Sequence, residues 1–521
     1  MGRDRNRQLR AGWSTVRSTL AARFAIDTRT LAVFRIWVAL LVVADLLLRA
    51  RNFELFYTEA GVVPQSLALA APPVDVPSIY FLSTEPWVPA ALFSSHGLLA
   101  GLLLVGYRTR LSTVLVAVFV VSLDLRNPLV LSYADTLFMW LLFWAMFLPL
   151  GERWSVDAVH ADREPRERVG GLPSALILLQ VVTVYFVNGL HKTGSEQWAS
   201  GEAAIVVMGL DDMTFLAADL VASVPGVLQL GGRIWFYMLL GSWLLIVLRG
   251  RARTALVAGF VAVHLSFAVT VRIGAFAFVS IAGVMLFLQS SFWTDLQRVV
   301  QTGHVDEGLS RLSTNAESIA ERLPQGPELG VHRAVRRHRR PVVGLVAGIV
   351  AVVVVVSLLS AGGVLDSQPA ADIEAGASTV VDHQTEWSIF APEPRSTTRQ
   401  YVIAAESTTG SQWDLQSDRE LTADRPAELQ TQFGSYRERF YLSSVRRDSP
   451  EGTQQLLVDH YCETITVDGE PISHLTLYVI EESVTVETAR TPTDRERTIR
   501  ELGSYGCTDE PPERVVVPDS A

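Results

Sequence analysis

The residue with the clearest potential for chemistry is a lysine at the end of an apolar stretch. The stretch begins near Pro173, and 19 steps of about 1.5 Å bring Lys192 roughly 29 Å along a helix, about one hydrocarbon thickness. Lys192 is the only lysine among 44 basic residues, the others being arginine. Arginine stays protonated at any working pH, whereas burial can turn a lysine amine into a base. The sequence therefore indicates a functional amine at a membrane surface, with an accident of composition as the alternative.

Composition places part of the chain in lipid and part in water. Hydrophobic residues make up 49% of the 521 residues, and the mean hydropathy is +0.27. Residues 362–521 contain 13 arginines against 29 acidic residues, while the rest of the chain is mildly basic. A strongly acidic soluble part excludes nucleic acid as an expected partner. An acidic surface with almost no lysine is also typical of high-salt organisms.

Nine apolar runs predict a polytopic α-helical membrane protein in the cell membrane. Arginine clusters follow the second, fourth and sixth runs and precede the ninth. With nine crossings, all these clusters lie on the side of the Arg-rich N-terminus, which predicts N-inside and C-outside. A further crossing at 213–230 would put them on the wrong side. The runs cover residues 31–48, 88–106, 111–124, 133–149, 173–191, 233–249, 253–270, 273–289 and 341–361.

These runs divide the chain into five parts. The membrane domain is expected to carry about eight of the crossings, with the loops 49–87 and 193–232 folding over its outer mouth. The expected parts are a basic cytoplasmic N-terminus (1–30), a helical membrane domain (31–290), a cytoplasmic linker (291–340), a last membrane helix (341–361) and an acidic extracytoplasmic domain (362–521).

The C-terminal part shows short alternating runs that predict a β-rich, sandwich-like domain. Asp468-Gly469 is a turn signal between two of these runs. Both cysteines, Cys462 and Cys507, lie in this part, and a disulfide suits an oxidising compartment. Two unpaired buried thiols are the alternative. The predicted strands begin at Gln400, Arg439, Gln455, Leu475 and Ser483.

Several ionisable residues lie inside the apolar runs, where charges are costly. They indicate either a polar cavity under the outer mouth or structural pairing between helices, for instance Arg35 with an aspartate. His264 stands alone on its run, so a satisfied core histidine is as good an interpretation as a site residue. No spacing of metal ligands, phosphate-binding glycines or a serine nucleophile is present, so no metal is expected. The residues are Arg35, Asp45, His96, Asp124, Asp135 and His264.

The sequence resembles the HTTM-domain family and its relatives, the vitamin K-dependent γ-glutamyl carboxylases. The central match is Tyr185-Phe-Val-Asn-Gly-Leu-His-Lys192 followed by Trp198. The acidic composition favours a prokaryotic, haloarchaeal-type member. Further matches are Phe34-Arg35-Ile36, Tyr57-Thr-Glu-Ala-Gly-Val-Val-Pro64, Arg126-Asn127-Pro128, Arg153-Trp-Ser-Val-Asp157 and Trp387-Ser-Ile-Phe-Ala-Pro-Glu-Pro394.

The resemblance implies quinone chemistry at Lys192. In the carboxylases the matching lysine deprotonates a reduced naphthoquinone of the menaquinol or vitamin K type. Reaction with O2 then generates a stronger base, a glutamate γ-carbon loses its proton and takes up CO2, and a quinone epoxide leaves. By the same resemblance Asn127, Trp198, Tyr185 and His264 become candidates for quinone binding, and an extracytoplasmic protein becomes a candidate substrate.

Two departures keep other interpretations open. The carboxylases carry a histidine directly after the matching asparagine, where this chain has Pro128, which weakens the expectation of carboxylation more than that of quinol oxidation. The C-terminal region is also shorter than theirs. The alternatives are a non-catalytic binding or scaffold protein that works through its β-domain, and a transporter or other quinone-handling protein. Both should tolerate Lys192→Arg.

Overall fold

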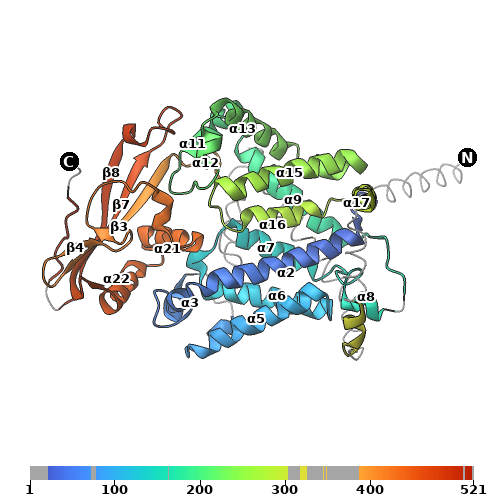
Figure 1. Cartoon of the computed structure of the whole chain (residues 1–521), viewed down its shortest axis with the longest axis horizontal. Helices are drawn as coiled ribbons and strands as arrows, with labels where there is room; N and C mark the ends of the chain where they lie inside the picture. Colours follow the sequence, from blue (N-terminus) through green and yellow to red (C-terminus); the bar gives the residue numbers. More distant parts are fainter. Residues whose placement is uncertain are drawn as a thin grey trace, which may run out of the picture.

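The computed structural model describes residues 22–71, 78–161, 163–302, 317–325, 387–508 and 511–518, together with Gly344 and Gly348. It consists of a bundle of long helices with a β-rich domain at one end (Figure 1). The predicted last membrane helix, 341–361, lies outside the described residues apart from those two glycines, as do most of the predicted N-terminus and linker.

The helical bundle is built around α2 and α7. Helix α2 packs against α5 and α16, and α7 contacts α6, α9 and α16. Helix α9 carries Lys192 at its end and also packs against α13. The helices are α2 (Thr28–Ala50), α5 (Trp87–Val105), α6 (Thr109–Arg126), α7 (Tyr133–Ala145), α9 (Leu172–His191), α13 (Pro225–Leu240), α15 (Gly250–Thr270), α16 (Phe276–Met285) and α17 (Ser290–Thr302).

Membrane-spanning length is reached by fewer helices than the nine apolar runs predict. Among the described residues, α2, α5, α9 and α15 are long and apolar enough to cross a membrane, and a fifth span results if α16 and α17, bent by 102°, count as one. Helix α7 has only 13 residues, and the run 233–249 is divided between α13 and the four-residue α14 (Leu244–Val247). A helical membrane protein is therefore confirmed, but the count of nine is not supported.

Local sequence signals explain where the functional helices begin and end. Helix α9 begins beside Pro173, a residue suited to the first turn of a helix, and the Gly171 N–H donates to Ser174 Oγ at 2.9 Å. Helix α7 begins with a capping box in which Ser132 and Asp135 satisfy each other's backbone N–H groups. Lys192 itself closes α9, because its N–H bonds back to the Gly189 carbonyl at 3.1 Å.

Short elements fill the two loops that were expected to cover the outer mouth. Loop 49–87 contains α3 (Phe53–Tyr57), α4 (Gln65–Ala70) and η1 (Ile79–Phe81). Loop 193–232 contains α10 (Glu196–Ser200), α11 (Ala203–Met208) and α12 (Ala218–Ala222) before α13 begins. At the opposite end lie α8 (Val156–His160) and a two-stranded sheet of β1 (Ile26–Asp27) and β2 (Arg168–Val169).

The C-terminal domain contains one antiparallel sheet in the order β5-β4-β3-β7-β6, with β8 also paired to β7. The turn Asp468-Gly469 joins β6 to β7, and both of its residues have positive φ, as the sequence indicated. Helices α21 (Tyr436–Arg447) and α22 (Thr453–Thr464) accompany the sheet. The strands are β3 (Thr397–Ser407), β4 (Gln412–Asp414), β5 (Arg419–Glu420), β6 (Thr466–Val467), β7 (Glu470–Ser483) and β8 (Arg497–Gly506).

A β-rich domain is confirmed, but the sandwich and three of its five predicted strands are wrong. The runs at Arg439 and Gln455 lie inside α21 and α22, and the run at Ser483 leaves the sheet after its first residue. Apolar runs of four residues do not distinguish a strand from a buried helix turn. The helix signal is Ser435 followed by Glu438, since the Ser435 side chain accepts from the Glu438 N–H at 3.2 Å.

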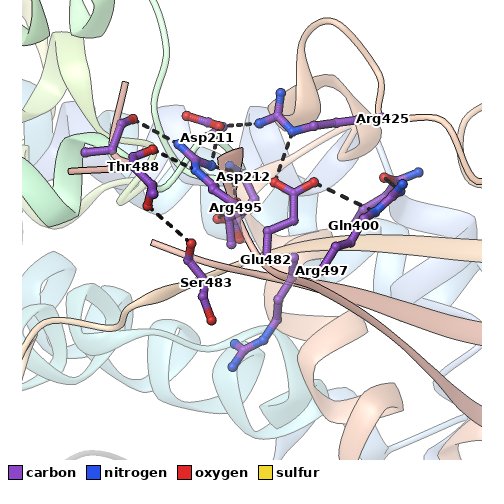
Figure 2. Close-up of polar contacts among 12 residues, drawn as sticks. Asp211, Asp212, Gln400, Arg425, Glu482, Ser483, Thr488, Arg495 and Arg497 are labelled. Atoms are coloured by element: carbon purple, nitrogen blue, oxygen red, sulfur yellow. Dashed lines mark hydrogen bonds and ion pairs between the residues drawn. The ribbon is translucent and has the colours of Figure 1, made fainter. Parts of the chain in front are cut away.

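Two ionic clusters fix the C-terminal domain to the bundle. The first joins the loop after α11 to the sheet (Figure 2). Asp211 pairs with Arg425 and, at 2.7 Å, with Arg495. Glu482 accepts from Arg425 at 3.1 Å, so this arginine bridges the two acidic groups. Beside them Asp212 is bound by Arg395 and by the Thr398 hydroxyl.

The second cluster is buried where α21 meets α2, α6 and α7. Arg49 pairs with Asp45 at 2.7 Å, with Asp124 at 2.6 Å and with Asp135 at 3.3 Å. Arg437 pairs with Asp45 and, at 2.9 Å, with Asp135. These two arginines and three aspartates form the Arg49–Arg437 cluster, whose formal charge is −1. It satisfies the intramembrane aspartates by contacts that include the C-terminal domain.

Among the residues that the structure describes, no aspartate forms an ion pair with Arg35, which the sequence had offered as one of two alternatives. Its buried guanidinium donates to the carbonyls of Leu150 and Arg153, each at 3.1 Å, and to that of Trp154. Arg35 lies on α2 more than two turns before Asp45, near the α8 end of the bundle. Its hydrogen bonds therefore stabilise the loop that contains Leu150 and Arg153.

Candidate functional site

Lys192 lies buried at the end of the bundle that faces the C-terminal domain. Its side chain is 1% exposed. The amine donates to Asn188 Oδ1 at 2.8 Å, one helical turn earlier, and to the carbonyl of Ile389. It also lies 4.6 Å from the centre of the Trp198 ring. No carboxylate within ion-pair distance of the amine occurs among the described residues, so Lys192 has neutral partners only.

The segment Trp387–Phe390, here called the strap, closes over Lys192. Asn188 Nδ2 donates to the carbonyls of Trp387 at 2.7 Å and Ile389 at 3.1 Å. Trp198 Nε1 donates to the Phe390 carbonyl at 3.0 Å. The tail motif singled out in the sequence therefore contacts the lysine motif directly, although almost 200 residues separate them.

A cavity of about 520 Å³ adjoins the lysine and the strap. Its walls come from α7, the helices α9 to α13, α15, α16, α21 and the strap, and its lining is mostly apolar and aromatic. Among its few polar groups are Lys192, Asn188, Tyr133 and Arg439. A large apolar pocket with a few convergent polar groups is the usual form of a small-molecule site.

Burial lowers the pKa of the Lys192 amine from its ordinary value near 10.5 to about 7. The cause is loss of hydration, which disfavours the ammonium form. An appreciable fraction of the amine is therefore neutral at neutral pH. A neutral amine that faces an apolar cavity can accept a proton from a bound acid.

Tyr185 and His264 meet at one side of the site. The Tyr185 hydroxyl and His264 Nε2 are 2.7 Å apart, and both rings pack against Trp235. Tyr185 and Trp235 line the cavity, whereas His264 lies behind them. His264 Nδ1 is buried and has no hydrogen-bond partner among the residues that the structure describes. His264 thus positions Tyr185 and does not itself face the cavity.

Asn127 is placed elsewhere. It follows α6 and is fully buried, and its Nδ2 donates to the Phe56 carbonyl at 3.1 Å. It does not line the Lys192 cavity. Of the four residues expected to bind a quinone, Trp198 and Tyr185 line the cavity and His264 lies behind it. Asn127 lies in a different part of the bundle, and its role toward a quinone stays a prediction.

Some residues of the site were not assigned a role from the sequence. Asn188 precedes Lys192 by four residues, and this spacing places the two side chains on one helix face. Arg439 was assigned to a strand, so its position at the cavity could not be expected. Arg437 reaches Asp135 over a separation of 302 residues, and no local signal announces such a contact.

The disulfide lies away from this site. Cys462 of α22 and Cys507, directly after β8, are joined, which fixes a helix of the C-terminal domain to its sheet. This is the pairing that the sequence offered as one of two alternatives.

Comparison with known proteins agrees with the geometry. The family model of the HTTM domain matches residues 24–293, slightly more than half of the chain. The match covers α2 to α16 and includes Lys192, Tyr185 and Trp198. No curated protein and no solved structure matches the chain significantly. The chain therefore belongs to the HTTM-domain family, which is related to the vitamin K-dependent carboxylases.

Proposed function

We propose that this protein is a membrane enzyme that oxidises a reduced quinone with O2, and that Lys192 is its base. The observation that carries the proposal is the buried amine of Lys192, which faces an apolar cavity and has no carboxylate partner among the described residues. A structural lysine would gain from a counter-ion, whereas a base must lose its proton easily. The neutral surroundings of Lys192 favour the second role.

The residues around Lys192 can hold and orient an aromatic ring. Trp198, Trp235 and Phe267 provide flat apolar walls, and a volume of about 520 Å³ is in the usual range for ligand pockets. Asn188 accepts from the amine and donates to the strap, so the amine is held in one orientation. A quinol supplies two acidic hydroxyl groups and two electrons, and Lys192 would take up one of the hydroxyl protons.

A lipid-soluble substrate would enter from the side of the bundle. The cavity is bordered by α12 and α13, whose outer surfaces carry exposed apolar side chains. Val227 lines the cavity and is 66% exposed, while Leu220 is 73% and Leu230 is 55% exposed. Exposed apolar surface of this kind suits contact with lipid tails. These residues support access from the bilayer.

The arrangement of charge supports a cytoplasmic N-terminus and an extracytoplasmic C-terminal domain. Helices α8 and α17 lie at the far end of the bundle from the β-rich domain (Figure 1). Arginines concentrate at that end, including Arg163 and Arg166 on Glu152 and Arg251 on Asp295. Basic residues favour the cytoplasmic side, and a disulfide favours the opposite compartment. Lys192 would then lie near the outer surface, in reach of an extracytoplasmic protein substrate.

A second candidate function is a non-catalytic binding protein in which Lys192 serves only to hold the strap. The bond from the amine to the Ile389 carbonyl favours it. In that case arginine, which also donates hydrogen bonds, should preserve function, and any loss in a variant should follow loss of stability.

The test is O2 consumption by the purified protein supplied with reduced menaquinone. We expect Lys192→Arg to fold normally and to lose quinol oxidation, because a guanidinium does not release its proton at working pH. Arg447→Gln, a substitution of an exposed residue of α21, is the matched control and should keep wild-type turnover. Turnover that survives Lys192→Arg would refute the assignment of the base. Added bicarbonate tests separately whether CO2 is used, with a glutamate-containing peptide as acceptor.

A further inference from the structure

Arg439 lines the Lys192 cavity, and its guanidinium has no ion-pair or hydrogen-bond partner in the part of the chain that the structure describes. It lies on α21, and its Nε is buried without a hydrogen bond. The centre of the Phe440 ring lies 5.0 Å from its guanidinium carbon. Lys192 has two hydrogen-bond acceptors, whereas the described residues offer Arg439 none.

The neighbouring charges leave Arg439 uncompensated. Arg437, two residues earlier, is bound by the aspartates of the Arg49–Arg437 cluster. Asp212 acts on Arg439 electrostatically, but its carboxylate is bound by Arg395. Burial lowers the pKa of Arg439 to about 10, so its guanidinium stays charged at neutral pH. Positive charge therefore exceeds negative charge at this wall of the cavity.

The kind of anion that fits follows from the charge and the shape. A guanidinium pairs with two oxygens of a carboxylate or a phosphate. One unpaired guanidinium matches the single charge of a carboxylate better than a phosphomonoester, which carries about −1.5 to −2. The remainder of the cavity is mostly apolar and borders the exposed apolar side of α12 and α13. Its occupant should therefore have one carboxylate and a long apolar body.

We propose that Arg439 is an anion-binding subsite of the Lys192 cavity, and that it holds the carboxylate of an amphiphile taken from the membrane. A quinol has no carboxylate, so this molecule is a second ligand of the cavity. The proposal goes beyond quinol oxidation and does not depend on it. Absence of quinol turnover leaves the subsite intact, and absence of carboxylate binding leaves the role of Lys192 intact.

The test is equilibrium binding of radiolabelled oleate to the full-length protein in lipid nanodiscs. Oleyl alcohol, which has the same tail without the charge, and N-acetylglutamate amide, which has the carboxylate without the tail, serve as competitors. We expect oleate to bind wild type, oleyl alcohol to compete weakly, and Arg439→Gln to weaken oleate binding on the order of tenfold or more. Arg447→Gln on the same helix is the matched control and should not change binding.

Two results would overturn the proposal. Equal affinity of oleate for wild type and for folded Arg439→Gln would show that the guanidinium is not the subsite. If N-acetylglutamate amide competes as strongly as unlabelled oleate, the ligand is not an amphiphile, and the result would indicate an acidic peptide instead. If Arg439→Gln does not fold, Arg439→Lys is measured in its place. This variant keeps the charge but cannot form a bidentate pair with a carboxylate, so we expect intermediate affinity. Affinity equal to wild type in that variant counts against paired carboxylate binding.

Discussion

Removal of Arg437 should weaken the docking of the C-terminal domain on the bundle. Arg437→Met deletes the contacts to Asp45 and Asp135 and a hydrogen bond to the Val130 carbonyl at 3.2 Å. The formal charge of the buried cluster then changes from −1 to −2, because Arg49 alone faces three aspartates. Breaking a buried ion pair by removing one partner costs roughly 3–5 kcal/mol. For a unit of 150–250 residues this corresponds to a melting temperature lower by roughly 6–20 °C.

Thermal unfolding in detergent, followed by limited proteolysis, measures this effect. Arg447→Gln is again the control and should change the free energy of unfolding by no more than about 0.5 kcal/mol, since its side chain is exposed. Adding Asp45→Asn to Arg437→Met restores the cluster charge to −1. We therefore expect the double variant to lose less free energy of unfolding than the two single variants lose together, by about 1–3 kcal/mol. Additive effects, or a loss below about 1 kcal/mol for Arg437→Met, would refute this account of the interface.

Three further predictions follow from individual contacts. Replacing Cys462 and Cys507 by serine should destabilise the C-terminal domain by about 2–4 kcal/mol, because their disulfide closes a separation of 45 residues, and denaturant unfolding with and without reductant would detect it. Gly201→Ala should destabilise the protein strongly, since φ is +86° and a Cβ would lie 2.0 Å from the Gln229 carbonyl oxygen. Gly250→Ala, where φ is +54° but the space is open, should cost about 1 kcal/mol. Equal melting temperatures of the two variants would contradict this prediction. Between pH 7 and pH 10 the unfolded protein keeps a proton on Lys192 that the folded protein has released, so stability should rise with pH by up to about 1.4 kcal/mol per unit, and Lys192→Met should remove that slope.

The sequence predicted the parts of the fold that depend on local pattern. Apolar runs located α2, α5, α9 and α15, since a membrane span needs a long uninterrupted apolar stretch. The Asp468-Gly469 turn and the strands around Gln400 and Leu475 were predicted because turn residues and short alternating runs are also local signals. Short runs failed: Arg439 and Gln455 begin apolar stretches of a few residues that suit a helix face as well as a strand.

The sequence predicted the residues next to the amine of the site but not those that the C-terminal domain contributes. Lys192 and Trp198 belong to one motif, so both could be predicted from the sequence. In the structure the Lys192 amine lies 4.6 Å from the centre of the Trp198 ring. The strap was noticed as a motif, but its position over Lys192 results from a contact over 197 residues. Arg439 reaches the cavity only because the C-terminal domain docks on the bundle. Such long-range contacts depend on domain packing, which no spacing in the sequence reports.

The most direct test of Lys192 as a base is the pH dependence of quinone epoxide formation. Purified protein in detergent receives reduced menaquinone and O2 between pH 5.5 and 8.5, and epoxide is quantified by mass spectrometry beside Lys192→Ala. We predict epoxide from wild type alone, with a rate that rises with pH and reaches half its maximum near pH 7, where the amine loses its proton. No epoxide from folded wild type with several quinones and at high salt, or equal epoxide from Lys192→Ala, would contradict the proposal.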